Sequence, residues 1–272
     1  MHKYIIAILC CDALSYSFPT EKEKVVDTIK EFKVLSSHGV IDGCVGCLDG
    51  LLLRIQTPWT RDTGHVKSYF LGHYQAYGIN VQACCDSKCC FTFVCLAAPG
   101  GCNDIAAFRK TGLSTLINNL PIGKYVIGDN AYICTEHLLT PFSGEERKEK
   151  AKDAYNFYLS QIRMRIEMAF GRLTSKWRIL KRPLQVRLKN VGALFLCITR
   201  LHNFCINEGE VVTDSSNSEN DSEDSSDSQF FPSDVTTTTI TGNSMLRDIL
   251  VNEIQRNSLA RPQYNLDRNG KS

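Results

Sequence analysis

Three carboxylates in this sequence stand where an acidic side chain is costly or isolated. Asp49 interrupts the apolar stretch CLDGLLLRI, where an ionised group costs free energy unless it binds something. Asp129 ends the hydrophobic run KYVIGD, and Glu167 is the lone acid in a stretch crowded with Arg and Lys. Mg²⁺ prefers oxygen ligands, and a pair of such cations activates the nucleophile and stabilises the leaving oxygen in phosphodiester cleavage. The pattern therefore predicts a metal-dependent centre that acts on phosphodiesters.

Each carboxylate also has a purely structural interpretation. An Asp followed by Gly or Asn often makes a turn, which would account for Asp49-Gly50 and for Asp129-Asn130. Glu167 would pair with Arg163, one helical turn earlier on the same face. For any one of them alone the structural interpretation is favoured, because lone carboxylates are commonplace. The three together, in the order of elements that follows, favour the metal site.

Hydrophobic periodicity predicts the elements that must position these residues. Helices are predicted over 20–36, from 103 or 104 to 117, over 154–180 and over 191–206. Strands are predicted at 44–48 continuing through 51–55, in a hairpin over 77–97, and at 124–129. The first helix is expected to be capped by Thr20, with an apolar stripe made of Val25, Val26, Ile29 and Phe32. This order predicts an α/β, ribonuclease-H-like fold, in which helices flank a mixed sheet.

Several segments at these spacings resemble the PIF/Harbinger transposases and the nuclease-like proteins derived from them. The matching stretches are GVIDGCVGCLDG (39–50), APGGCNDIAAFRKTGL (98–113), YVIGDNAY (125–132), LLTPF (138–142), YNFYLSQIRMRIEMAFGRLTSKWRIL (155–180) and RLHNFCI (200–206). The resemblance implies a DDE-type nuclease or transposase domain over 17–207 that cleaves DNA. Its catalytic, metal-binding triad falls on Asp49, Asp129 and Glu167, with Mg²⁺ or Mn²⁺ as the cofactor. The resemblance also implies work in the nucleus, with the cytoplasm as a second location, and a separate Myb-like DNA-binding partner.

The chain departs from the family pattern at two motifs. Leu51-Leu52 stand where family members commonly have Thr-His, and Asn103-Asp104-Ile105 stand where they commonly have His-Asp-Ser. Asp104 is a further candidate as an auxiliary metal ligand or as a group that orients one, and a helix cap is its alternative interpretation. An inactive descendant that binds DNA or protein is the alternative to an active nuclease, and the intact triad favours the nuclease.

Charge is distributed unevenly, although the totals of 31 Lys and Arg and 29 Asp and Glu nearly balance. Positions 161–200 carry ten Lys and Arg against one acid, whereas 208–234 carry nine acids and no base. Such a basic stretch predicts phosphate contacts that do not depend on DNA sequence. The residues predicted to bind DNA are Arg163, Arg165, Arg172, Lys176, Arg178, Lys181 and Arg182.

The remaining segments have simpler interpretations. Residues 1–16 are expected to be the remnant of an N-terminal helical region, 208–240 an acidic disordered linker, and 241–272 a tail with a short helix. Thirteen cysteines, several adjacent and most in apolar runs, indicate reduced, buried thiols rather than a disulfide framework or a zinc site. No apolar run is long enough to predict a membrane span, and the oligomeric state stays open.

Overall fold

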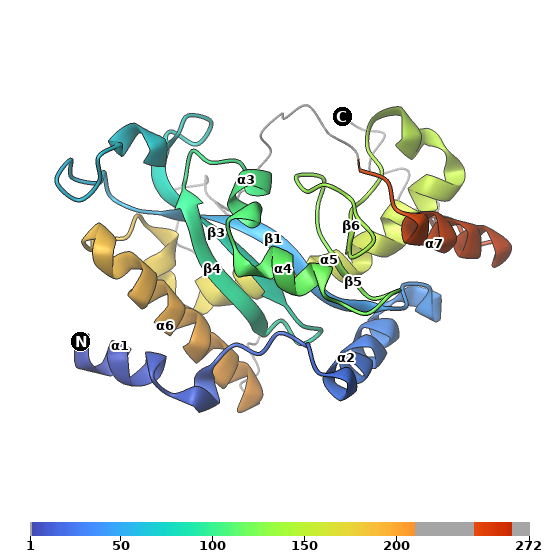
Figure 1. Ribbon diagram of the computed structural model, residues 1–272, viewed down its shortest axis with the longest axis horizontal. Helices are drawn as coiled ribbons and strands as arrows, with labels where there is room; N and C mark the ends of the chain where they lie inside the picture. The colour runs from blue at the N-terminus through green and yellow to red at the C-terminus, as the bar shows by residue number, and fades with distance from the viewer. Residues whose placement is uncertain (1, 210–241, 263–272) are drawn as a thin grey trace, which may run out of the picture.

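A computed structural model describes residues 2–209 and 242–262, and a mixed sheet lies at its centre (Figure 1). In spatial order the strands are β4, β3, β1, β5 and β6, and the short β2 pairs with the start of β3. β1 is antiparallel to β3 and parallel to β5, so it joins the hairpin to the parallel strands. The bounds are β1 Cys44–Arg54, β2 Phe70–Leu71, β3 Ala76–Cys85, β4 Phe91–Pro99, β5 Tyr125–Ile127 and β6 Leu138–Leu139. This is the ribonuclease-H-like arrangement that the sequence predicted.

Helices cover both faces of the sheet. α5 and α6 share one apolar core with one face, and α2 and α4 form a second core on the other face. The helices are α1 His2–Leu9, α2 Lys22–Leu35, α3 Asp104–Arg109, α4 Gly112–Asn118, α5 Lys150–Lys176, α6 Leu188–Asn207 and α7 Met245–Arg256. Short 3₁₀ turns lie at Asp12–Leu14, Ser37–Gly39, Val66–Tyr69, Gly144–Lys148 and Arg178–Lys181. In the described part of the chain, no helix has both the length and the apolar character needed to span a bilayer.

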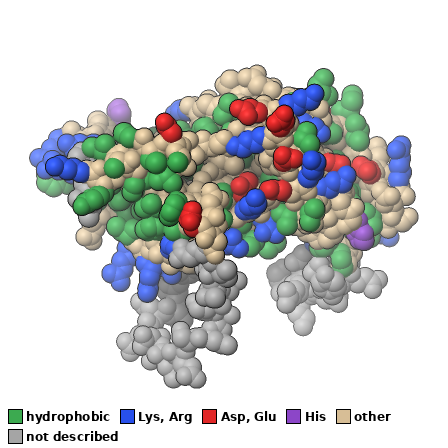
Figure 2. All heavy atoms as spheres, turned by 90° about the horizontal axis from the view of Figure 1, so that it is seen from below, with side chains coloured by type: hydrophobic (Ala, Val, Ile, Leu, Met, Phe, Trp, Pro, Cys, Tyr) green, Lys and Arg blue, Asp and Glu red, His purple; other side chains and the backbone are tan. Residues whose placement is uncertain are grey.

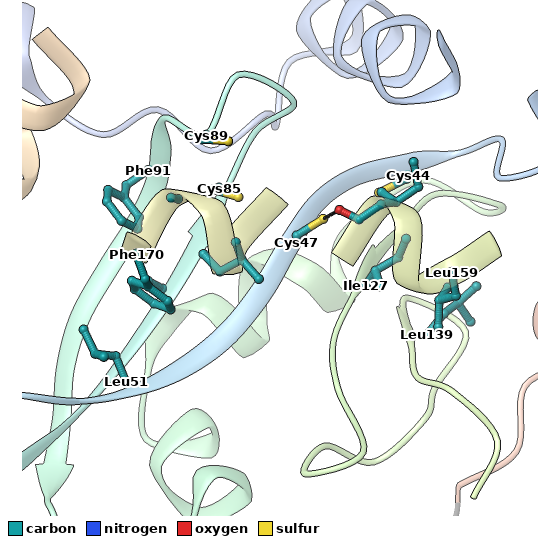
Figure 3. Packing of buried hydrophobic residues seen from close by; sticks show 14 of the residues in the cluster. Cys44, Cys47, Leu51, Cys85, Cys89, Phe91, Ile127, Leu139, Leu159 and Phe170 are labelled. Carbon is teal, nitrogen blue, oxygen red and sulfur yellow. Dashed lines mark hydrogen bonds between the residues drawn. The ribbon is translucent and has the colours of Figure 1, made fainter. Parts of the chain in front are cut away.

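Helix α5 crosses the middle of the sheet and makes the main core contact. Its periodic apolar residues are buried as predicted, and the Cys47 thiol of β1 donates to the Ile162 carbonyl of the helix at 3.2 Å (Figure 3). All thirteen cysteines are free thiols. Burial raises the pKa of Cys84 and of Cys85 to about 12, so these thiols stay protonated near neutral pH and pack as small apolar groups. The prediction of reduced, buried thiols agrees with this arrangement.

Several local predictions were wrong. Glu21, not Thr20, precedes α2 and no side chain caps that helix, while Val26 is exposed rather than part of the apolar stripe. The helix expected to reach residue 117 is two helices, because the first ends at Lys110 before Gly112 starts the second. The strand predicted at 44–48 and continuing through 51–55 is confirmed, since β1 runs unbroken through Asp49. The turn interpretation of Asp49-Gly50 is therefore excluded.

The short helix predicted within the C-terminal tail is α7, and it packs against α5. The Glu136 carboxylate accepts hydrogen bonds from the backbone of Met245 at 2.7 Å and of Leu246 at 3.3 Å, where it also meets the positive end of the helix dipole. The Arg247 guanidinium lies 3.9 Å from the centre of the Phe142 ring. The predicted acidic linker falls almost entirely in 210–241, outside the described residues.

Hydrophobic and charged side chains lie on different parts of the surface. Seen from below, hydrophobic side chains gather on the half of the molecule where α1 and α6 lie, and acidic and basic side chains alternate on the other half (Figure 2). Tyr4 and Ile6 of α1 are among the exposed apolar residues, and the Arg200 side chain donates to the carbonyl of Leu9 at the end of that helix.

If α7 is part of the folded core, Ile254→Ala will lower the free energy of unfolding by about 2–5 kcal/mol, because Ile254 is fully buried. Urea unfolding followed by circular dichroism measures this. Ile249→Ala is the matched control on the same helix, since Ile249 is 51% exposed and should change stability by no more than about 0.5 kcal/mol. Equal, small effects of the two substitutions would mean that α7 is not part of the cooperative unit.

Candidate active site

Asp49 lies within β1, and Asp129 lies just after the end of the neighbouring parallel strand β5. In the pairing of β1 with β5, Cys47 lies opposite Ile127. Asp49 comes two residues after Cys47, and Asp129 comes two residues after Ile127. Side chains two residues apart share a face, so both carboxylates lie on the face that Cys47 and Ile127 present to the core beneath α5. Neighbouring strands are about 4.8 Å apart, which places the two carboxylates side by side.

The environment of Asp49 opposes its charge. Asp49 is 7% exposed, and burial raises its pKa well above the ordinary value, with the neighbouring charge of Asp129 raising it further. Two groups act in the opposite direction: the Gly50 N–H, which donates to the carboxylate at 2.8 Å, and the guanidinium of Arg163. In the metal-free protein the neutral carboxyl of Asp49 is therefore favoured, and a cation bound beside it would favour the anion.

Asp129 combines two of its predicted roles. It is half-buried at the end of β5, and its carboxylate accepts a hydrogen bond from the Ala131 N–H at 2.9 Å, which closes a turn. Its charge nonetheless acts on Asp49 across the strand pair. The turn fixes the carboxylate at the end of the strand, so the structural and the chemical interpretations are compatible.

Glu167 is not gathered with the two aspartates. Its carboxylate lies 2.7 Å from the Arg163 guanidinium, one helical turn back on α5, and its side chain is 48% exposed. Within residues 2–209 and 242–262, no three His, Cys, Asp or Glu side chains are grouped so as to hold a metal ion. Arg163 is the link, because the same side chain pairs with Glu167 and lowers the pKa of Asp49.

Asp104 lies on the opposite face of β1, behind Asp49. Its carboxylate accepts hydrogen bonds from the side-chain amides of Asn80 at 2.9 Å and Gln82 at 3.0 Å. The helix cap is Asn103, whose side chain accepts from the Ala106 N–H, so the cap interpretation of Asp104 is wrong. The carboxylate of Asp104 is buried and already bonded, which suits a group that orients the site more than a ligand.

Gly50 allows the Asp104 carboxylate to lie close to β1. A Cβ atom at Gly50 would lie 2.3 Å from the Asp104 carboxylate oxygen, so no larger residue fits at position 50 beside Asp104. The side-chain amide oxygen of Gln82 accepts a hydrogen bond from the Tyr132 hydroxyl at 2.7 Å. Tyr132 lies in the loop that follows Asp129. Sequence reasoning missed Asn80, Gln82 and Tyr132. The available signal was a pair of amides two residues apart in a strand that is otherwise apolar.

The predicted DNA-binding residues do not form a single surface. Arg163 faces the carboxylates, whereas Arg165 and Arg172 are half-buried beside Cys89, whose pKa they lower against the effect of burial. Residues two apart on a helix lie on nearly opposite sides, which separates Arg163 from Arg165. Lys176 is half-buried near His202, while the exposed members follow α5: Arg178, Lys181 and Arg182. Only this last group is presented freely to solvent.

The LHNF segment has a structural role in this fold. The Asn203 side chain accepts from the Phe91 N–H and donates to the Phe91 carbonyl, both at 2.7 Å, which joins α6 to the start of β4. The ring of buried His202 bonds the Cys89 carbonyl at 3.0 Å, and burial lowers its pKa. Both side chains thus hold the tip of the hairpin.

The fold and the paired aspartates define a ribonuclease-H-like nuclease domain. Residues 48–203 match the model of the DDE superfamily endonuclease family, DDE_Tnp_4, and the chain belongs to this family. It is 24% identical to "Protein ALP1-like" of Arabidopsis thaliana over an alignment of 208 residues, which covers 70% of this chain. The chain covers 49% of that protein, so it spans about half the length of this relative. No solved structure matches the chain.

The raised pKa of Asp49 predicts how stability depends on pH. Folding favours the protonated carboxyl, so this contribution is fully present below the unfolded pKa and is lost as the pH rises through the folded pKa. In EDTA, Asp49→Asn should match the wild type at low pH and become progressively more stable than it as the pH rises.

Urea unfolding at several values between about pH 4 and pH 8 measures this difference. Asp27→Asn is the control, because Asp27 is exposed on α2 and pairs only with Lys30. Curves for wild type and Asp49→Asn that stay parallel over the whole range would refute the raised pKa.

Proposed function

We propose that this chain is a transposase-like DNA endonuclease that cleaves phosphodiester bonds with a divalent metal ion held by Asp49, Asp129 and Glu167. The observation that carries the proposal is the closeness of two carboxyl groups, buried Asp49 in β1 and Asp129 just after the paired strand β5, whose charge raises the pKa of Asp49. Membership of the DDE superfamily endonuclease family supports the reaction class. The third carboxylate, Glu167, pairs with Arg163, and the charge of Arg163 also lowers the pKa of Asp49.

The donor set fits Mg²⁺ or Mn²⁺. All three groups are hard oxygen ligands, and the two aspartates repel each other in a way that a divalent cation relieves. A cation bound there supplies Lewis-acid activation of the attacking oxygen and neutralises charge on the leaving oxygen. Glu167 would be the third ligand, and its side chain is exposed enough to change rotamer and leave Arg163.

The other polar side chains near the carboxylates position the site or bind the DNA. Asp104, Gln82 and Tyr132 link α3, β3 and the loop that follows Asp129, and β3 is the strand that pairs with β1. Arg163, once released from Glu167, is a free guanidinium beside the carboxylates, suited to bidentate contact with a phosphate. The exposed cations after α5 contact the phosphates farther along the DNA.

DNA is the proposed substrate, and we place the work in the nucleus with help from a separate Myb-like DNA-binding protein, as the family resemblance implies. The chain's own cations provide affinity without sequence preference, so a partner would supply the target sequence. The alternative is an inactive descendant that binds DNA or protein. The replacement of Thr-His by Leu51-Leu52 and the engagement of Glu167 with Arg163 are the observations in its favour.

Removing any of the three carboxylates should nearly abolish cleavage. Asp49→Asn, Asp129→Asn and Glu167→Gln keep the side-chain shape and remove the anion that holds the cation. Nicking of supercoiled plasmid in Mg²⁺ or Mn²⁺ should fall by about a hundredfold or more, and calorimetric titration should show weaker Mn²⁺ binding. Asp27→Asn is the control and should keep both properties. Equal nicking by wild type and Asp129→Asn would assign the cleavage to contamination and leave the inactive binder standing.

Neutralising the exposed cations should change DNA affinity and leave metal binding alone. Arg178→Gln and Lys181→Gln should each reduce the slope of log affinity against log salt by about 0.9 if each contacts one phosphate. Lys181→Gln retains the carbonyl that accepts a hydrogen bond from Arg54, so the local structure should persist.

Fluorescence anisotropy of labelled duplexes at several salt concentrations gives the slope, with Lys30→Gln on α2 as the control. An unchanged slope in both variants would remove these residues from the interface. Binding of one sequence far more tightly than random DNA would refute the dependence on a partner.

A further inference from the structure

A cleft opens beside the candidate site, between the segment that connects β1 to β3 and the basic segment after α5. It has a volume of about 700 Å³, and Leu51, Tyr74 and Pro183 are among the residues that line it. Leu51 is two residues from Asp49, so the cleft begins roughly 7 Å along the strand from that carboxylate. A smaller hollow of about 110 Å³ continues it past Thr57, lined in part by Trp59 and Arg187.

The two walls are held together by backbone pairing. Ile55 forms a parallel bridge with Leu184; the Leu184 N–H donates to the Arg54 carbonyl at 3.0 Å, and the Gln56 N–H to the Leu184 carbonyl at 3.2 Å. Of the basic segment 178–189, Pro183 lines the cleft and Arg187 lines the smaller hollow. Residues 51–77 and 178–189 together contain one acid, Asp62, and the following cations: Arg54, Arg61, Lys67, Arg178, Lys181, Arg182, Arg187 and Lys189. Such walls favour a polyanion.

The aromatic side chains specify which polyanion. Trp59 is 56% exposed, and the Arg61 guanidinium lies 3.9 Å from its ring centre, so one face of the indole is paired with a cation. Tyr74 and Tyr77 line the cleft, and its floor is apolar at Leu51 and Leu52. Phosphates gain nothing from such surfaces, whereas the faces of nucleobases stack on them. Bases inside a duplex are already stacked on their neighbours, so an exposed Trp selects an unpaired strand.

We propose that this cleft and the hollow that continues it bind a single-stranded segment of DNA next to the phosphate that is cleaved, with Trp59 stacked on a base and Arg54, Arg61 and Arg187 on the backbone. The position of the cleaved phosphate rests on the proposed function, and the binding itself does not. The cleft therefore receives DNA whose strands have separated near the cut.

The chain contains two tryptophans, which makes the test direct. In the full chain carrying Trp177→Phe, Trp59 is the only tryptophan, and its fluorescence reports on the cleft. In EDTA, a single-stranded oligonucleotide should quench this fluorescence, and an abasic oligonucleotide of equal length should quench it far less. Absence of quenching, or equal quenching by the abasic strand, would overturn the proposal.

Affinity gives a second readout. Trp59→Ala should weaken binding of the single strand by about tenfold, and it should change binding of a blunt duplex by less than about twofold. Tyr4→Ala is the control, because Tyr4 is an exposed aromatic residue on α1 and should alter neither. Equal losses for single strand and duplex would overturn the proposal, because they would show that Trp59 does not distinguish an unpaired base.

Nicking in Mg²⁺, measured on the same preparation, separates the two hypotheses. Metal-dependent nicking without a response from Trp59 would refute the cleft and leave the nuclease in place. Quenching by the single strand without any nicking would refute the nuclease and support the cleft as a binding surface.

Discussion

A carboxyl group buried in the middle of the central strand is the constraint on which the surrounding structure depends. Asp49 lies in β1, where burial and the neighbouring Asp129 both raise its pKa. Water does not solvate it there, so the protein supplies the Gly50 N–H and the guanidinium of Arg163. Because Arg163 comes from α5, the position of that helix on the sheet is coupled to the same charge. Arg163 also pairs with Glu167, so one cation acts on two of the three candidate ligands, Asp49 and Glu167.

The face of the sheet behind Asp49 is organised by a second polar group. The Asp104 carboxylate, the Gln82 amide and the Tyr132 hydroxyl form a chain of hydrogen bonds from α3, across β3, to the loop after β5. Tyr132 comes three residues after Asp129, so this chain ties the loop carrying one aspartate to the strand that pairs with the other. Displacing any member would move both candidate ligands, which is how groups that touch no substrate can control a metal site.

Local patterns predicted the elements, and distant partners account for what they missed. The period of Ile162, Ile166 and Phe170 was sufficient to predict α5, because one face of a long helix must be apolar. β6 was not predicted, since two residues carry no periodicity. The packing of α7 depends on Glu136, more than a hundred residues away, and no local pattern contains it. The basic residues of α5 were grouped by their closeness in sequence, whereas helical geometry sends Arg163 and Arg165 to different sides.

The energetics of Asp49 also bear on whether the chain is an active nuclease or an inactive binder. A buried carboxylate with a raised pKa lowers stability near neutral pH, and a neutral residue of similar shape would remove that cost. A protein that only binds DNA needs cations on its surface and has no need for an anion in its central strand. The cost is accounted for when the anion binds a divalent cation, because the attraction then offsets both the desolvation of Asp49 and its repulsion from Asp129. The same reasoning explains Arg163: in the metal-free protein it pairs with Glu167, and its charge lowers the pKa of Asp49. The burial of Asp49 therefore favours the nuclease.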